Sequence, residues 1–469
     1  MEGEEEKLKT KNKIYLKTFF LTAVYGLLTA SIFLEPAYSF FPFDFFRSKP
    51  KGETTAAPNS ADQPPLTLEE SYRLALQQSE DVAMKREELE KAQGHLYLAI
   101  NEIAPEINFL MTDTVQDAPK KGTSTTNSDT TTSNLSRRTN PQKKFTLHQP
   151  IFSGFKEIAG LQGAGAEKAQ KKYEKQRAEE TLLSSVVDAF YSVIQAEKDI
   201  QTLEESKKTL ENRIQELKDR VQLGRSRESE IQTALSDEKV VESQLVSSRS
   251  QEVIARQTLE YYIGRTVEGP LVDMDTDLSE AKGVDDYLDK LDTRSDVKAA
   301  NEAYILAEKN VVVERSGFFP SVYLDGNYYT QRVGSQSGID WDAVLSVKVP
   351  VFNGTQTFGD VKVAAAEKEM AKYNFLKTKR LAKLDIRKTL DEYKSIRLEE
   401  VALGEAVAAK KKDYELEAEE YKLNLVNNLD VLKALKDYQD LSRDLNQTHY
   451  DVKRKYWALK VAVGETIQT

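Results

Sequence analysis

Two hexapeptides, 200 residues apart, decide the architecture of this chain: Gln149-Pro-Ile-Phe-Ser-Gly154 returns as Val349-Pro-Val-Phe-Asn-Gly354. The same offset relates further pairs: Ala166-Glu-Lys168 with Ala366-Glu-Lys368, Tyr173 with Tyr373, Leu223 with Leu423, and Gly264 with Gly464. Upstream the offset is 215, as between Pro105 and Pro320, so one loop is longer in the first copy. Self-similarity of this kind predicts a repeated structural unit. We expect a first repeat over 66–280 and a second over 281–469.

Both hexapeptides close a predicted pair of strands. Apolar residues alternate with polar ones before each hexapeptide, as in Ile107, Phe109 and Met111, and this period of two favours strands. The strands are expected at about 106–115 and 143–153 in the first copy, and at about 321–331 and 341–353 in the second. The polar loop 113–140 between the first two is expected to be solvated.

Long helices surround the strands in each copy. The first helix is predicted over about 68–103, with a counterpart over about 295–316, and each stops before a proline. After the strands, helical sequence of about 70 residues, or roughly 100 Å, runs to Gly224 and to Asn424. Gly and Asn most readily take the left-handed conformation that ends a helix, so the chain should reverse there. The predicted fold class is α+β: a duplicated unit of long coiled-coil helices with two strands per copy.

The N-terminal 39 residues resemble an export signal. Lysines precede an apolar run, Phe19 to Leu34, and Ala37 and Ser39 follow as a small-x-small site, which is the pattern of a secretory signal peptide. A single anchoring helix is the alternative. Residues 40–65, which end in a stretch rich in Pro, Ser, Thr and Ala, are expected to be a linker.

The composition excludes several classes of protein. The chain has 469 residues, a formal net charge of −10 and no cysteine, which argues against nucleic acid as a partner and excludes disulfides, thiolate catalysis and a lipidated cysteine. Its three histidines, His95, His148 and His449, lie far apart in sequence. We find no catalytic triad, no paired catalytic carboxylates and no metal-ligand spacing, so we expect neither an enzyme nor a cofactor.

Four strands with one apolar face cannot close a barrel, and open strand edges are not tolerated in lipid. Copies of the chain would therefore have to pool strands: two would give eight and three would give twelve. An ordinary soluble hairpin packed on one side gives the same alternation and is the alternative.

The sequence resembles the TolC-type outer-membrane efflux and secretion channel family over about 66–466. The resemblance is carried by the entry Leu66-Thr-Leu-Glu-Glu-Ser-Tyr-Arg-Leu-Ala75, Gly317-Phe-Phe-Pro-Ser321, the two strand-closing hexapeptides, and Tyr421-Lys-Leu-Asn-Leu-Val-Asn-Asn-Leu-Asp-Val-Leu-Lys-Ala434. It implies a homotrimer with a twelve-stranded β-barrel in the outer membrane and an α-helical barrel in the periplasm. It further implies a passive conduit of a tripartite efflux pump or type I secretion system. The implied partners are a periplasmic adaptor (membrane fusion) protein, an inner-membrane RND or ABC pump, and outer-membrane lipid.

The resemblance also implies functional residues at the two chain reversals. The expected adaptor-contacting tip consists of Leu223, Gly224, Arg225 and Ser226 in the first copy and Leu423, Asn424 and Leu425 in the second. Tyr421 and Asp430 match the family's gate tyrosine and first luminal aspartate. The gate's basic position is Val426 here and its second aspartate is Lys433, which puts the usual lock and the doubled acidic ring in doubt. As a hypothesis, Asp430 forms a cation-favouring carboxylate ring that Lys433 weakens by pairing with it.

Two other classes of protein compete with a channel. A periplasmic adaptor or coiled-coil scaffold also has long hairpins, but it would place one hairpin within a small β-domain rather than duplicate the whole unit. An exported binding protein or enzyme would need a site, and none is found.

Overall fold

The computed structural model describes residues 65–115, 117, 139–274, 278, 280–333 and 336–467, all within the unit from Ser60 to Thr469. The predicted signal peptide, the linker up to residue 64 and most of the predicted loop 113–140 lie outside the described residues.

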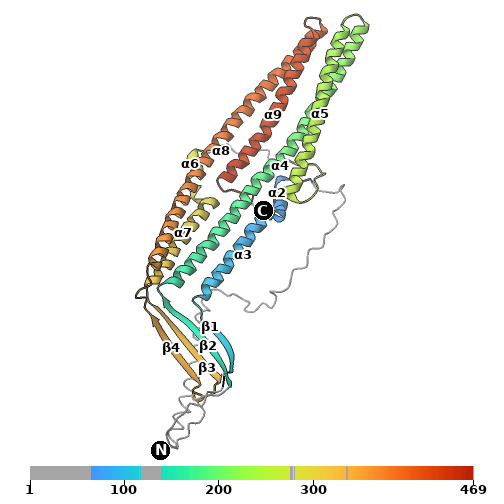
Figure 1. Ribbon diagram of the computed structural model, residues 1–469. Helices are drawn as coiled ribbons and strands as arrows, with labels where there is room; N and C mark the ends of the chain where they lie inside the picture. The colour runs from blue at the N-terminus through green and yellow to red at the C-terminus, as the bar shows by residue number, and fades with distance from the viewer. Residues whose placement is uncertain are drawn as a thin grey trace, which may run out of the picture. The chain divides into compact units, whose positions relative to one another are not determined.

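The strands form one antiparallel sheet in the order β1-β2-β3-β4 (Figure 1). The bounds are β1 Glu106–Val115, β2 Thr139–Ser153, β3 Ser321–Gln331 and β4 Trp341–Lys348. β2 begins four residues before the predicted position, and β4 ends at Lys348 instead of near 353. Pro350 follows the end of β4 by two residues, whereas Pro150 at the equivalent repeat position lies inside β2. β2 and β3 are paired on both sides, whereas β1 and β4 each have one edge with no partner strand in this sheet.

One face of the sheet is apolar and the other is polar. The register pairs Phe109 with Phe145, Leu324 with Leu345, and Val322 with Val347, and directly paired residues share a face. The opposite face carries His148, which bonds Asp325 through its Nδ1 at 2.6 Å. Both faces are open in the single chain, because every residue of β1 is exposed and most large apolar residues of the sheet are as well.

Two helices of 67 residues each, α4 (Lys156–Gln222) and α8 (Gln356–Lys422), extend from the sheet. Each reverses into a shorter helix, α5 (Glu228–Ile263) or α9 (Asn428–Ala462), to form a helical hairpin. Nearer the sheet, α3 (Glu80–Asn101) packs on α4 and α7 (Ser295–Arg315) lies between α4 and α8. The remaining described helices are short: α2 Leu68–Gln78, α6 Val284–Leu288, η3 Leu291–Thr293 and η4 Ser316–Phe318. The sheet and the two hairpin turns lie at opposite ends of this unit (Figure 1).

The single helix predicted over 68–103 is two helices, α2 and α3. Ser79 separates them with an extended ψ of 115°, and its side chain caps α3 by accepting a hydrogen bond from the Val82 amide. A serine followed by two acidic residues is a helix-start signal, and here it wins over the continuous apolar pattern. None of the described helices combines the length and apolar composition that a membrane crossing requires.

A buried arginine and the serine after it join four helices midway along the unit. Arg294 is 2% exposed and bonds Asp296 of α7 at 2.8 Å and Asp385 of α8 at 3.0 Å, and it donates to the Ala462 carbonyl of α9. The adjacent Ser295 hydroxyl donates to Glu180 of α4 at 2.6 Å. Burial alone would raise the pKa of Asp296, but the hydrogen bond and charge of Arg294 outweigh it and lower that pKa.

Replacing this arginine should strongly destabilise the helical part. Arg294→Met leaves two carboxylates without their cation, and breaking a buried ion pair in this way costs about 3–5 kcal/mol. The measurement is denaturant unfolding followed by circular dichroism at 222 nm, with Arg225→Met at an exposed position as the control. Because the pKa of Asp296 is lowered in the folded state, its contribution is present above the ordinary aspartate value of 3.8 and is lost as pH falls below it. Equal stability of the two variants would contradict this assignment.

Candidate functional site at the ends of the helical hairpins

Both hairpins end in the same hydrogen-bonded turn. Gly224 has φ 69° and Asn424 has φ 58°, which confirms the left-handed conformation expected at both. In each turn the next amide bonds back to the helix, from Arg225 to the Arg220 carbonyl at 2.8 Å and from Leu425 to the Glu420 carbonyl at 3.0 Å. This is the Schellman pattern, which satisfies carbonyl groups that a helix end leaves free.

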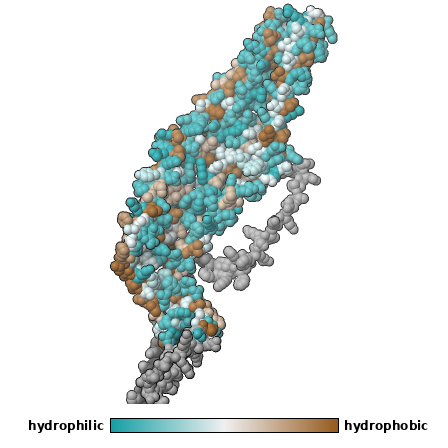
Figure 2. Space-filling model, in the orientation of Figure 1, coloured by the Kyte–Doolittle hydropathy of each residue, from teal (hydrophilic) through white to brown (hydrophobic). Residues whose placement is uncertain are grey.

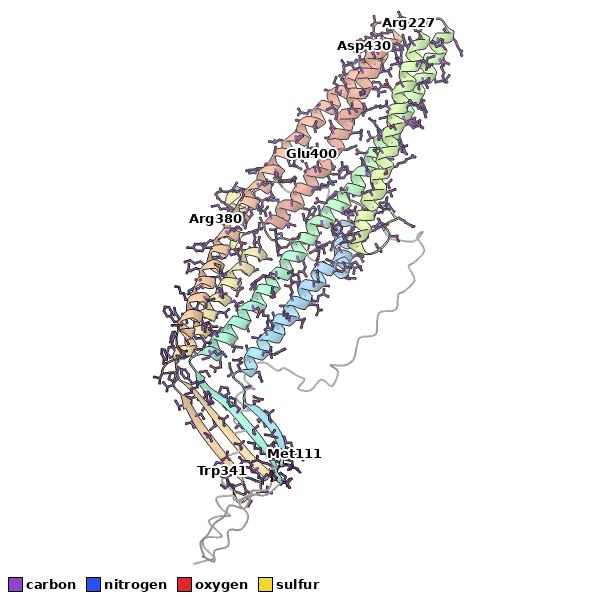
Figure 3. All side chains as sticks on the ribbon, viewed as in Figure 1. Met111, Arg227, Trp341, Arg380, Glu400 and Asp430 are labelled. Carbon is purple, nitrogen blue, oxygen red and sulfur yellow. The ribbon has the colours of Figure 1, made fainter. Side chains whose placement is uncertain are left out.

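The two tips differ in chemistry. The first presents Arg225 and Arg227 to solvent, and neither forms an ion pair in the part of the chain that the structure describes. The second presents Leu423, Leu425 and Leu429, each about two-thirds exposed. Figure 3 shows Arg227 and Asp430 at the ends of their respective hairpins. All seven predicted tip residues therefore lie in or beside the two turns.

Just behind the tips, a polar cluster joins one hairpin to the other. We call it the cross-hairpin cluster; its members are Arg213, Glu216 and Arg220 of α4, Glu230 of α5, Tyr421 of α8 and Asn428 of α9. Tyr421 is at its centre and only 6% exposed. The guanidinium carbons of Arg213 and Arg220 lie 3.9 and 4.4 Å from the centroid of the tyrosine ring.

Hydrogen bonds fix the geometry of the cross-hairpin cluster. The Tyr421 hydroxyl and the Glu230 carboxylate are 3.2 Å apart, and Arg220 donates to the Tyr421 carbonyl at 3.3 Å. Arg213, itself 8% exposed, donates to the Asn428 side chain at 3.0 Å. Glu216 pairs with both arginines, at 2.8 and 3.4 Å. The cluster thus holds the two hairpins together with charged groups and an aromatic ring.

This arrangement gives Tyr421 basic partners that the sequence did not indicate. The family's basic position is Val426 here, and it supplies no cation to Tyr421. Tyr421 instead contacts two arginines supplied by the other hairpin, while Val426 is half-buried against apolar neighbours. Sequence comparison within one hairpin could not find these arginines, since they lie about 200 positions away along the chain.

The expected pairing of Asp430 with Lys433 is absent. The Asp430 carboxylate turns back to accept the Asn427 amide at 3.3 Å, and Asn427 accepts the Asp430 amide at 3.1 Å. This reciprocal capping box stabilises the start of α9 and draws Asp430 away from the next turn. Lys433 is exposed, and no ion pair joins it to Asp430 among the described residues.

A carboxyl that the sequence did not single out lies in the electrostatic field of Asp430. Partial desolvation raises the pKa of Glu417, and the charges of Asp430, Glu420 and Asp413 raise it further. The site therefore contains a group of like charges on the second hairpin. Within the described residues no cluster of side chains is arranged to hold a metal ion.

Comparisons with known proteins agree with this architecture of a sheet carrying long helical hairpins. The model of the outer membrane efflux protein family matches residues 71–265 and 287–465. The chain therefore belongs to the outer membrane efflux protein family. It is a protein of the outer membrane with its helical part in the periplasm, and it is homologous to the channels of tripartite efflux pumps. The family consists of channel proteins and not of enzymes.

Solved structures share the fold at low sequence identity. The structure of CusC, described as forming a transmembrane channel, is 16% identical with a TM-score of 0.73, covering 85% of this chain and 92% of that one. The outer membrane protein VceC of Vibrio cholerae is 19% identical with a TM-score of 0.73, covering 86% and 97%. The open state of the MtrE outer membrane channel of Neisseria gonorrhoeae is 18% identical with a TM-score of 0.69, covering 86% and 91%. No curated protein sequence matches the chain significantly.

Removing the two cations from the cross-hairpin cluster should loosen the hairpin ends. A desolvated cation–π contact contributes about 2 kcal/mol, so the double variant Arg213→Met/Arg220→Met should accelerate amide exchange near Tyr421 and Asn428 by roughly tenfold or more. Hydrogen–deuterium exchange with mass spectrometry measures this. Arg225→Met, which removes an exposed arginine of the same hairpin, is the control. Unchanged exchange in the double variant would show that the cluster does not hold the hairpins together.

Proposed function

We propose that three copies of this chain form a passive export conduit, with a twelve-stranded barrel in the outer membrane and a helical tunnel through the periplasm. The observation that carries the proposal is the four-stranded sheet with one apolar face and two unpaired edges. Such a sheet is stable in lipid only when other strands close it. The conduit serves a tripartite efflux pump or type I secretion system, with a periplasmic adaptor and an inner-membrane RND or ABC pump.

The helices supply a second reason for ring assembly. In the two hairpins the helices pack side by side in the order α5, α4, α9, α8. The outer sides of α5 and α8 are therefore the free edges of this row. Each free edge exposes apolar side chains, including Val246 and Val253 of α5 and Leu398 and Val401 of α8. Unlike edges that face each other in neighbouring copies generate a closed head-to-tail ring.

Cross-linking tests the ring in a chain that has no cysteine of its own. Arg256 of α5 pairs with Glu197 of α4, so Val253 lies at the same height along the hairpin as residue 198 or so of α4. The repeat offset of 200 places Leu398 at the same height on α8. Val253→Cys/Leu398→Cys, treated with a short bis-maleimide in membranes, should give covalent dimers and trimers and nothing larger.

Each single-cysteine variant is the matched control and should stay monomeric, because a head-to-tail contact joins unlike surfaces. A ladder that stops at the dimer would favour an eight-stranded assembly of two chains. Cross-linking of the single variants would indicate a two-fold contact and would refute the ring.

The hairpin ends are proposed as the closable entrance. The cross-hairpin cluster keeps the second hairpin against the first, and separation of the two would widen the entrance. Leu223, Gly224, Arg225 and Ser226 of the first tip and Leu423, Asn424 and Leu425 of the second are proposed to contact the adaptor. The exposure of six of them supports that role; Ser226 is half-buried.

Asp430 is proposed to form an acidic ring at the entrance, repeated by symmetry and reinforced by Glu417. Asp430→Asn should lower cation selectivity in single-channel recordings, while an asparagine can still accept the capping bond of α9. Lys433→Met, one turn along the same helix, is the control and should not lower selectivity, because Lys433 does not neutralise Asp430.

The same recordings carry a pH test. Because the pKa of Glu417 is raised above its ordinary 4.5, selectivity should fall as pH drops through the region just above that value. Asp430→Asn removes one cause of the shift and should move the fall to lower pH. Selectivity that is identical in wild type and Asp430→Asn at every pH would exclude Asp430 from the ring.

A further inference from the structure

The half of α8 nearest the sheet carries a strong excess of positive charge. Between Lys362 and Lys388 the chain has nine basic and three acidic residues, although its overall net charge is −10. Within this stretch Lys377 and Arg380 are exposed, and neither forms an ion pair with any residue that the structure describes. We call these two residues the basic stripe; Figure 3 shows Arg380 on α8 between the sheet and the hairpin end. The described part of the chain therefore leaves the basic stripe without a partner.

Helix α3 carries the opposite charge on its outer side. Glu80, Glu87 and Glu90, which we call the acidic stripe, are exposed and have no basic partner among the described side chains. The buried residues of α3, Val82 and Ala92, face α4, against which α3 packs. At about 100° per residue, the acidic stripe lies on the opposite side of the helix from them.

The two stripes lie on the free edges of one row of helices. Between the sheet and the hairpins the helices pack in the order α3, α4, α7, α8, so α3 and α8 are the edges (Figure 1). The buried Ala382 and Ile386 of α8 belong to an apolar cluster with Val297 of α7, and the basic stripe lies on the other side of α8 from that cluster. The row thus ends in negative charge on one edge and in positive charge on the other.

Both stripes lie at the same height along the row. Lys171 of α4 pairs with Glu88 of α3 at 3.2 Å, and the repeat offset of 200 makes Lys171 equivalent to residue 371 of α8. Because α3 runs toward the sheet and α8 runs away from it, the acidic stripe covers the heights of about residues 369–379 of α8. The basic stripe overlaps that interval. Helical side chains tilt toward the N-terminus of their own helix, so Glu87 and the basic stripe lean toward the same height.

Apolar side chains continue both edges toward the sheet. Tyr97 and Leu98 on α3 and Met370 and Tyr373 on α8 are each about two-thirds exposed. Figure 2 shows hydrophobic surface beside the sheet, which gives way to largely hydrophilic surface along the helices. A ring sets its copies at equal height, so the α8 edge of one copy and the α3 edge of the next present apolar surface and charge in the same order.

We propose that the basic stripe of one copy pairs with the acidic stripe of the next, and that this pairing steers the copies into head-to-tail order. The proposal rests on the proposed channel function, because it takes the two copies to be neighbours in the ring. Two copies that met through their α3 edges, or through their α8 edges, would bring like charges together. Exposed ion pairs add little to affinity, whereas complementary charge speeds the encounter of two surfaces and rejects wrong alignments.

Charge reversal on each edge tests the pairing. The variants are Lys377→Glu/Arg380→Glu, Glu87→Lys/Glu90→Lys and the fourfold combination of both; Glu80 is kept because it also starts α3. Each full-length protein is refolded into detergent at about 50 and about 500 mM NaCl, where charge screening is weak and strong. Light scattering coupled to size exclusion follows the appearance of trimer, and circular dichroism at 222 nm confirms that the helices have formed.

The matched control reverses two exposed arginines that lie far from both edges. Arg225→Glu/Arg227→Glu at the first tip changes the net charge by the same amount as the reversal of the basic stripe. This variant should form trimers at the rate of the wild type, because the hairpin tips take no part in the pairing.

The pairing predicts that each edge reversal slows trimer formation about tenfold or more at low salt, and by a smaller factor at high salt. The fourfold variant, in which the two edges have exchanged their charges, should recover to within about threefold of the wild type. Edge reversals that assemble at the wild-type rate, or a fourfold variant as slow as either edge reversal, would overturn the pairing and leave the ring intact. Wild-type protein that is not trimeric when extracted from membranes would refute the ring and the pairing together.

Discussion

In lipid, every backbone amide and carbonyl needs a hydrogen-bond partner, and this need governs the structure. Four strands satisfy that need in the interior of the sheet and leave it unmet along β1 and β4. The free energy of an unpaired strand edge in a bilayer is too unfavourable for the chain to remain single there. Assembly is therefore a consequence of the strand count. In the periplasm the exposed apolar side chains at the edges of α5 and α8 favour assembly for a different reason, the burial of apolar surface.

Duplication explains how one chain supplies matching parts to both the sheet and the helical part. Both long helices have 67 residues, so the two hairpins end at the same distance from the sheet. Equal length places both tips at the same level, while their exposed residues differ: two arginines and Leu223 on the first, and three leucines on the second. The repeat thus preserves geometry and leaves the surfaces free to specialise.

Local sequence signals predicted most of the fold and only part of the site. The alternation around Phe109 and the residue types at 224 and 424 depend on near neighbours, so the strands and the turns were predictable from short stretches. Ser79 shows the limit of periodicity, because a capping serine ended a helix whose apolar pattern continued. The partners of Tyr421 were not predictable in this way, because Arg213 and Arg220 meet it only after two separate hairpins have packed together.

The contact between the hairpins combines apolar and charged groups, and this determines what their separation exposes. The apolar seam of the first hairpin, with Leu210 and Leu217, belongs to one cluster with Val431, Leu432 and Leu435 of the second. Parting the hairpins there would expose apolar surface to water, at about 25 cal/mol for each Å². The groups of the cross-hairpin cluster nearest the tips include guanidinium, carboxylate and amide groups, which water solvates when they part. Separation at the entrance should therefore begin at the tips, where these charged groups lie.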